Sequence, residues 1–322
     1  MRFRTSHSTL ATFAILTITH AAASTPSKFV TVNGARLEYL DWGGSGPPLL
    51  FLGGLGCTAH IFEDLAPEFK SNHRSLALTR RGFGKSEQTA GGYELDSLAH
   101  DIFFFATRLG LGDVTLVGHS YGGTEAIRAA QLFPQLVRRV ILLDTANDTI
   151  PPDAPAAEAE LFAAFTGMSN SDRLSSLEND RAWEKRLLGN VWSNAAESDL
   201  RETDIISNDG SVQSRTPGRI SGAIVSDRAK GKWDSTSIPV PALLIFANNP
   251  WTEMLAGLDL DTRQIAEITK AWADLDAARR SQIEAFRRNS PQATIVEMEH
   301  TVHHCFIQWK ERVAEEMRRF LH

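Results

Sequence analysis

Short apolar runs alternate with longer stretches of helical periodicity through most of the chain. The runs are largely aliphatic, which is typical of strands buried on both faces of a sheet. They lie at 49–52, 76–79, 114–117, 138–143, 239–246 and 293–298. Amphipathic helical periodicity follows at 94–109, 124–133, 251–289 and 310–321. This alternation predicts parallel strand–helix–strand units, and therefore an α/β fold with a mostly parallel, doubly wound sheet flanked by helices.

Two segments depart from the alternation. Near the start, residues 29–32 and 36–40 flank Asn33-Gly34, a pair that strongly favours a two-residue hairpin turn. After Thr149, a cluster of prolines marks a change in composition, and residues 156–230 show a helical pattern. Because the strand pattern resumes near residue 239, we expect a helical cap inserted after the sixth core strand, over the carboxyl edge of the sheet.

The N-terminus has the pattern of a secretory signal. Arg2 and Arg4 precede an apolar core at 10–18 and an Ala-rich cleavage pattern before Ser24. We therefore expect a signal peptide at 1–23, core segments at 24–148 and 238–322, and a cap at 149–237. This interpretation predicts a secreted or periplasmic protein with no integral membrane segment after cleavage, since no apolar stretch reaches the length of a bilayer.

Composition narrows the class of protein. The 322 residues are 42% apolar and 22% charged, typical of a globular domain. A net charge of −6 without any basic run argues against a nucleic-acid partner. The only cysteines, Cys57 and Cys305, form neither a disulfide framework nor a metal-ligand spacing, although export would permit a bridge between them.

The central candidate for chemistry is Ser120, in the stretch VTLVGHSYGG at 114–123. A buried strand breaks into G-x-S-x-G and a helix follows, which is the context of a nucleophile elbow. Such a turn holds the serine in a strained backbone conformation and presents its hydroxyl above the sheet edge. Glycines flank the serine because strand and helix pass very close to each other there.

A second element of an acyl-transfer site follows the first buried run. The sequence Gly53-Gly54-Leu55-Gly56 stands where a loop can offer a backbone N–H to a developing oxyanion. We expect one donor from Leu55 and the other from Tyr121, the residue after the nucleophile. A plain flexible turn is the alternative for this loop.

These motifs resemble those of the α/β-hydrolase superfamily over nearly the whole chain after residue 23. Residues 79–86 are similar to the superfamily's D-x-R-G-x-G-x-S turn, with Thr79 in place of the aspartate. Gly53 stands where a histidine is common. The resemblance implies the order nucleophile, acid, histidine along the chain. His303 is the best match for the histidine by its spacing to Val313 and Phe320-Leu321, with His304 and His300 as alternatives.

The sequence indicates the position of the catalytic acid less clearly than that of the nucleophile or the histidine. The superfamily usually places it after the strand at 242–246, but no carboxylate follows there until Glu253. Some members, including many haloalkane dehalogenases, carry it one strand earlier, and that resemblance selects Asp144. Asp148, Glu253 and a dyad without an acid remain alternatives. The acid would fix the tautomer of the histidine and stabilise its cation.

The sequence thus predicts a serine hydrolase that cleaves a carboxylic ester or similar acyl bond of a small, apolar molecule through an acyl-enzyme. This chemistry requires no cofactor and no metal. Two alternatives remain. One is a binding protein that kept the fold without turnover. The other is a dehalogenase or epoxide hydrolase, which the serine disfavours because those enzymes need a carboxylate nucleophile.

Overall fold

The computed structural model describes residues 25–145, 170–230, 233–248 and 261–322. An eight-stranded sheet runs through the molecule in the order β1-β2-β4-β3-β5-β6-β9-β10. The six strands β4, β3, β5, β6, β9 and β10 pair in parallel, whereas β1 pairs with β2, and β2 with β4, in antiparallel fashion. The bounds are β1 (Lys28–Val32), β2 (Ala35–Gly43), β3 (Pro48–Leu52), β4 (Arg74–Leu78), β5 (Val114–His119), β6 (Val137–Leu143), β9 (Ala242–Asn248) and β10 (Thr294–Glu299). The predicted fold class is confirmed.

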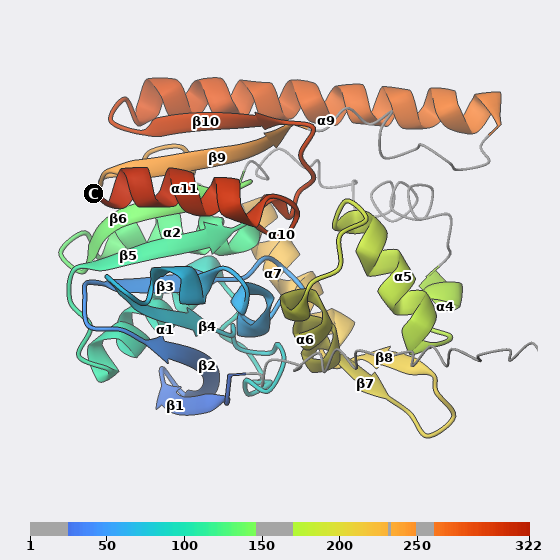
Figure 1. The fold of residues 1–322 in the computed structure, drawn as a ribbon, viewed down its shortest axis with the longest axis horizontal. Helices are drawn as coiled ribbons and strands as arrows, with labels where there is room; N and C mark the ends of the chain where they lie inside the picture. Colours follow the sequence, from blue (N-terminus) through green and yellow to red (C-terminus); the bar gives the residue numbers. More distant parts are fainter. Residues whose placement is uncertain (1–24, 146–169, 231–232, 249–260) are drawn as a thin grey trace, which may run out of the picture.

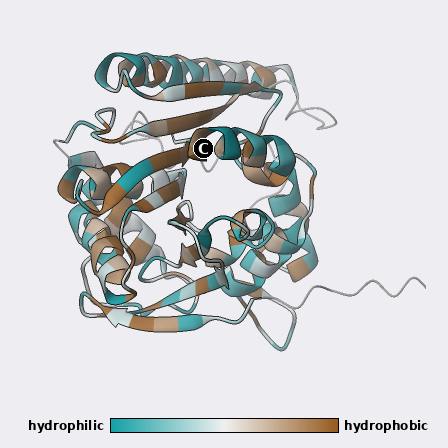
Figure 2. Ribbon diagram, turned by 60° about the vertical axis from the view of Figure 1, so that its left-hand side comes forward, coloured by the Kyte–Doolittle hydropathy of each residue, from teal (hydrophilic) through white to brown (hydrophobic). Residues whose placement is uncertain are grey.

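Helices cover both faces of this sheet (Figure 1). One face carries α1 (Leu95–Arg108), α2 (Tyr121–Leu132) and α9 (Thr262–Asn289). The other carries the short helices η1 (Ala59–Phe62), η2 (Ala66–Phe69) and α10 (Cys305–Gln308), together with α11 (Lys310–Leu321). Figure 2 shows the strands largely apolar and the long helices largely hydrophilic on their outer sides. The sheet is therefore the middle layer of a three-layer sandwich.

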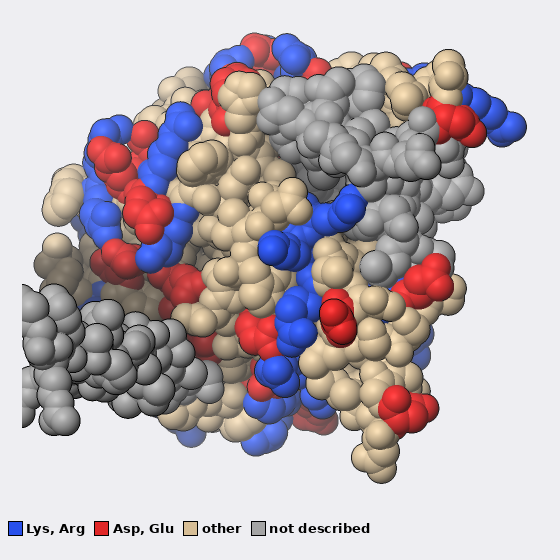
Figure 3. Space-filling model, turned by 45° about the vertical axis from the view of Figure 1, so that its right-hand side comes forward, with Lys and Arg blue, Asp and Glu red and all other residues tan. Residues whose placement is uncertain are grey.

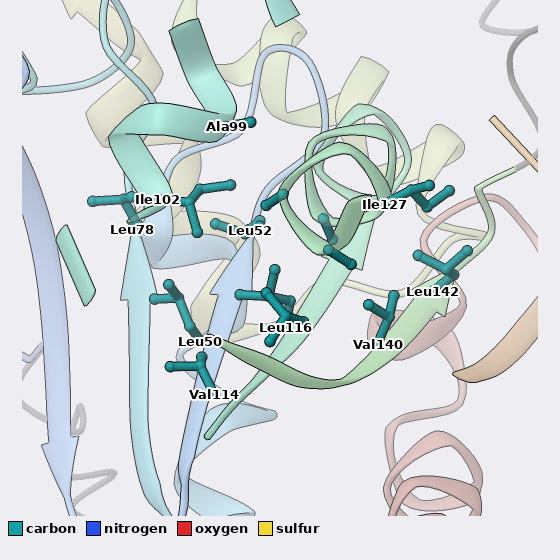
Figure 4. Packing of buried hydrophobic residues seen from close by; sticks show 14 of the residues in the cluster. Leu50, Leu52, Leu78, Ala99, Ile102, Val114, Leu116, Ile127, Val140 and Leu142 are labelled. Atoms are coloured by element: carbon teal, nitrogen blue, oxygen red, sulfur yellow. The ribbon is translucent and has the colours of Figure 1, made fainter. Parts of the chain in front are cut away.

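The strands are buried on both faces because their side chains alternate between two cores. In β3, Leu50 and Leu52 point toward α1 and α2, and Leu49 and Phe51 point toward η1 and η2. Figure 4 shows Ile102 and other helical side chains meeting the strand residues of the first core. Each such large side chain contributes roughly 1.5–3 kcal/mol by burial. The continuous apolar runs of the sequence follow from this two-sided burial.

The predicted N-terminal hairpin is confirmed. Val32 pairs with Ala35, and Asn33 and Gly34 occupy the turn with φ of 46° and 72°. Positive φ at both central residues is the requirement of the turn type that matches strand twist. This hairpin forms the antiparallel edge of the sheet, away from β5 and β6.

Residues 170–230 lie on the side of the sheet toward which β9 points (Figure 1). They comprise α4 (Asn170–Arg173), α5 (Leu177–Leu187), α6 (Asn194–Thr203), β7 (Asp204–Ile206), β8 (Val212–Ser214) and α7 (Gly218–Lys230). The interpretation of this region as helical throughout was wrong at the β7–β8 hairpin. Residues 207–211 join its strands, with Gly210 at φ 86°, and the Asp209-Gly210 pair within this loop is a hairpin signal.

The cap, described for residues 170–230, contacts the sheet domain chiefly through α6. The helix begins at Ser193, whose side chain accepts a hydrogen bond from the N–H of Ala196. Asp199 accepts hydrogen bonds from the backbone N–H and the hydroxyl of Thr58, at 2.8 and 2.5 Å. Two tryptophans lie in this region, and Trp192 packs against the second core. Trp183 lies under the Arg173 guanidinium, at 3.8 Å.

Several expectations fall on residues outside the described ranges, namely the signal peptide, the cap entry at 149–169, Asp148 and Glu253. Among the described helices, none combines the length and the apolar character needed to cross a bilayer. Basic and acidic side chains intermingle on the face in Figure 3, in agreement with the small net charge.

Candidate active site

Ser120 stands between β5 and α2 with φ 51° and ψ −122°. A positive φ is costly for a residue with a side chain, so the surrounding structure must hold it there. The N–H of Ser120 donates to the carbonyl of Leu143 at 3.1 Å, and its own carbonyl accepts from the N–H of Gly123 at 2.9 Å. The strained serine is thus fixed between two neighbouring strands and the first turn of α2.

Close packing explains the glycines around the serine. A Cβ at Gly118 would lie 2.4 Å from backbone atoms of Gly122 and Gly123, and one at Gly122 would lie 2.2 Å from the carbonyl oxygen of Leu52. A Cβ at Gly123 would lie 1.9 Å from Oγ1 of Thr145. These contacts leave no room for side chains, as the motif predicts.

The loop after β3 lies directly against the nucleophile. A Cβ on Gly54 would come within 3.2 Å of Cβ of Ser120. Leu55 follows in the same loop, and Tyr121 is the first residue of α2. The two predicted oxyanion donors therefore flank Ser120 from two elements, and their role remains a prediction.

A buried ion pair supports this loop, and the sequence analysis did not find it. The Arg80 guanidinium donates to the carbonyls of Gly53 and Gly54, at 2.8 and 3.1 Å. It also holds Glu125 of α2 through two hydrogen bonds, at 2.5 and 2.8 Å. Burial raises the pKa of Glu125, and the adjacent Arg80 opposes that rise. Arg80 thereby joins the loop before Leu55 to the helix that starts beside Ser120.

The structure brings His303 and Asp144 together. Nδ1 of His303 lies 2.7 Å from Oδ2 of Asp144, a hydrogen-bonding distance. The other oxygen, Oδ1, accepts from the N–H of Ala247 at 2.8 Å and lies 3.8 Å from the Arg279 guanidinium. Asp144 follows β6 directly and has a φ of 50°. Arg279 belongs to α9, and no feature of the sequence pointed to it.

The His303 loop also contacts the elbow. Nε2 of His119, the residue before the serine, lies 3.2 Å from the carbonyl oxygen of His303, and the two rings are 4.6 Å apart. Leu55, Ser120, Asp144 and His303 therefore follow strand ends at one edge of the sheet. The carboxyl ends of β3, β5, β6 and β10 share this edge because the strands from β3 to β10 in the sheet run parallel.

The alternative histidines and acids have other surroundings. His304 is packed beside His119, and burial, with His303 nearby, lowers its pKa to about 3. At the usual acid position after β9 stands Asn248, whose amide donates to both oxygens of Glu299 at 2.8 and 2.7 Å. Within the described residues, the geometry favours the pair His303–Asp144.

A second group of side chains meets beneath the elbow. Cys57, His119 and His304 each place one potential ligand atom within 4.8 Å of the others. The two cysteines are free thiols, and Cys305 is buried in the second core. The sequence analysis missed this cluster because its members are far apart in the chain and carry no metal-ligand spacing.

Comparisons with known proteins agree with this architecture. A family profile described as the alpha/beta hydrolase fold matches residues 47–189. The 2-(acetamidomethylene)succinate hydrolase of Mesorhizobium japonicum is 37% identical over 101 residues, which are 31% of this chain and 36% of that protein. N-formylmaleamate deformylase of Pseudomonas putida is 32% identical over 149 residues, 44% of this chain and 56% of that protein. Epoxide hydrolase 4 of Mus musculus is 32% identical over 121 residues, 37% of this chain and 34% of that protein.

The chain thus spans between 34% and 56% of the length of these three curated relatives. Solved structures are similar over much more of the fold. A crystal structure of E-2-(acetamidomethylene)succinate hydrolase covers 92% of this chain and 98% of its own, with a TM-score of 0.66 and 20% identity. An epoxide hydrolase of Bacillus megaterium covers 91% and 99%, with a TM-score of 0.62 and 18% identity. At these identities the likeness concerns the fold.

Proposed function

We propose that this chain is a serine hydrolase of the α/β-hydrolase superfamily that cleaves a carboxylic ester or a similar acyl bond. The observation that carries the proposal is the 2.7 Å contact of His303 with Asp144 at the sheet edge where Ser120 stands at φ 51°. A positioned imidazole beside a strained serine suits nucleophilic catalysis. The curated names of relatives include hydrolases of small molecules.

The mechanism assigns one role to each residue. His303 takes the proton of the Ser120 hydroxyl as the oxygen attacks the carbonyl carbon of the substrate. The N–H groups of Leu55 and Tyr121 hold the resulting oxyanion. His303 then protonates the leaving group, which departs and leaves an acyl-enzyme. A water molecule that gives a proton to His303 attacks this acyl group, and collapse of the intermediate returns the proton to Ser120.

Asp144 completes the arrangement in this proposal. Its carboxylate fixes the imidazole so that Nδ1 carries the proton and Nε2 is free to act as base. We also propose, from residues 1–23, that the protein is exported. The substrate is proposed to be a small molecule. Two relatives are named after compounds with amide-type groups. The assay panel therefore includes N-acyl compounds as well as apolar esters.

The first experiment treats the protein with a fluorophosphonate probe. We expect Ser120 to be labelled, the label to be absent in Ser120→Ala, and p-nitrophenyl ester hydrolysis to fall together with labelling. A protein that folds normally but takes up no label would contradict the proposal and favour a binding function. Assays for diol or halide formation serve as the control, because the alternative chemistry needs a carboxylate at position 120.

A second variant tests the acid. Asp144→Asn keeps the size of the side chain but no longer favours the required tautomer, so we expect kcat to fall by roughly 10³- to 10⁴-fold. Circular dichroism and the melting temperature check that the fold is intact. Near-normal turnover in a folded Asp144→Asn protein would assign the acid to another residue.

A further inference from the structure

Three side chains from separate segments meet behind the elbow. Cys57 comes from the loop after β3, His119 ends β5, and His304 precedes α10. Sγ of Cys57 lies 3.9 Å from Nε2 of His304, and a ring nitrogen of His119 lies within 4.8 Å of both partners. Around Zn²⁺, bond lengths of about 2.3 Å to sulfur and 2.0 Å to nitrogen put tetrahedral ligand atoms about 3.3–3.5 Å apart. Small side-chain rotations would bring the three ligand atoms, now within 4.8 Å of one another, to these separations.

His119 is oriented as a ligating histidine would be. Its ring is 1% exposed, and Nε2 donates to the carbonyl of His303 at 3.2 Å, which leaves the lone pair on Nδ1. Among the described residues, Nδ1 has no hydrogen-bond partner. A buried ring nitrogen without a partner is costly. Ligating histidines commonly donate their other N–H to a backbone carbonyl, as His119 does.

We propose that Cys57, His119 and His304 form a binding site for a thiophilic divalent cation such as Zn²⁺, with the fourth position open to water. One sulfur and two imidazoles are the donors that Zn²⁺ prefers. Burial lowers the pKa of both imidazoles, which favours the neutral form that ligation requires. Burial raises the pKa of the Cys57 thiol, so the cation must displace its proton on binding. Cys57 and His304 are only partly covered, so a cation can reach the site from solvent. The binding site is separate from the atoms proposed to react.

An occupied site would affect catalysis through its neighbours. His119 precedes Ser120, His304 follows His303, and the N–H of Cys57 donates to the carbonyl of Gly54 at 3.2 Å. Ligation draws His119 and His304 toward Cys57, and so displaces the residues that are joined directly to Ser120 and His303. The cation therefore inhibits hydrolysis. This inhibition rests on the proposed function, whereas binding of the cation does not.

The binding test uses Co²⁺ as a spectroscopic probe on the full chain after dialysis against chelator. We expect a thiolate-to-cobalt charge-transfer band in the wild type and none in Cys57→Ser. Zn²⁺ content after equilibrium dialysis should fall by about one equivalent per chain in Cys57→Ser and in His304→Gln. The matched controls, Cys305→Ala and His300→Asn, alter the other cysteine and a nearby histidine outside the cluster, and should retain the band.

A measurement on the unaltered chain covers the case in which a variant fails to fold. Zn²⁺ should slow iodoacetamide alkylation of Cys57 at least about tenfold, measured by peptide mass spectrometry. Absence of the cobalt band in the wild type, its persistence in folded Cys57→Ser, or alkylation that Zn²⁺ does not slow would overturn the site. Binding without chelator-reversible loss of ester hydrolysis would overturn only the inhibition. Absence of ester hydrolysis in metal-free wild type would instead count against the proposed function.

Discussion

Buried charges are arranged differently in the sheet domain and in the cap. In the sheet domain, each of two buried carboxylates faces its own guanidinium, with side chains about 5% exposed. Arg80 holds Glu125 through two hydrogen bonds, and Arg81 holds Asp101 in the same way. Arginine suits such sites because its planar fork matches a carboxylate. These charges are matched one to one.

In the cap, carboxyl groups outnumber the arginine that faces them. Arg173 contacts Asp180 and Glu184, and Asp204 adds a further carboxyl group. Burial raises the pKa of Asp204 to about 8, helped by the hydrogen bond it shares with Asp180. Burial likewise raises the pKa of Glu184 to about 7. It also raises that of Asp199 to about 7, although the Thr58 hydrogen bonds act against it.

The difference sets how each region responds to pH. A matched ion pair stays charged near neutral pH, so its contribution to the free energy of unfolding changes little there. A carboxyl group whose folded pKa lies above its unfolded pKa of about 4 binds a proton more tightly in the folded state. Its contribution to stability is complete below about pH 4 and is lost as the pH rises through 7 to 8. The cap should therefore weaken as the pH rises through 7 to 8.

The largest expected effect comes from breaking a matched pair. Arg80→Met removes the guanidinium and leaves Glu125 buried without its cation, which costs about 3–5 kcal/mol of unfolding free energy. We expect the melting temperature to fall by roughly 10 °C. Ester hydrolysis should fall as well, because the carbonyls of Gly53 and Gly54 lose their donor beside the oxyanion loop.

A double variant separates the two effects. Arg80→Met with Glu125→Leu leaves no unpaired charge, so most of the lost stability should return. The loop carbonyls still lack a donor, so turnover should stay low. Recovery of both stability and turnover would show that Arg80 acts only by neutralising Glu125 and that its hydrogen bonds to the loop are not needed for turnover.

A smaller effect is expected from pH in the cap. Between pH 6 and pH 9, deprotonation of Asp204 beside Asp180 should destabilise the cap, because the folded pKa of about 8 lies within that interval. Hydrogen exchange of peptides from 177–203, corrected for intrinsic rates, should show this loss of protection. Peptides from β5 and α2 should keep theirs.

Asp204→Asn is the variant that sharpens this test, since its amide carries no charge at any pH. We expect exchange in the cap to become less dependent on pH in that variant. The matched control is Asp209→Asn in the exposed turn of the same hairpin, which should leave the pH dependence unchanged. Equal pH dependence in Asp204→Asn and wild type would refute the assignment.

Much of the fold was readable from the sequence because its strands are buried on both faces. Runs such as 49–52 are continuously apolar, so their position could be predicted without knowing the partner elements. Terminal helix α11 begins at Lys310 and ends at Leu321, as its periodicity predicts. The β7–β8 hairpin was missed because its strands are only three residues each, too short to interrupt a helical pattern.

The site was readable only in part, because spacing identifies motifs but not contacts between them. Ser120 was marked by local glycines, which the close approach of strand and helix requires. Asp144 was selected by resemblance, and the structure puts it beside His303. Arg80 and Glu125 are 45 residues apart, and neither belongs to a motif that predicts their contact. Such contacts between residues far apart in the chain can be recognised only in the folded structure.

The smallest expected effect tests whether burial or distance determines the value of an ion pair. Lys85 lies in the same turn as Arg80 and reaches Glu202 of the cap at 2.6 Å, almost the distance of the Arg80–Glu125 pair. However, the Lys85 side chain is 43% exposed. Solvent screens such a pair, so Lys85→Met should cost at most about 1 kcal/mol and shift the melting temperature by no more than about 4 °C. The two methionine variants differ in the burial of the pair, and Arg80→Met also removes the hydrogen bonds to the carbonyls of Gly53 and Gly54. A loss in Lys85→Met as large as that in Arg80→Met would mean that the Lys85 bridge between cap and sheet domain is worth as much as a buried pair, and the contrast between the two regions would then not rest on burial.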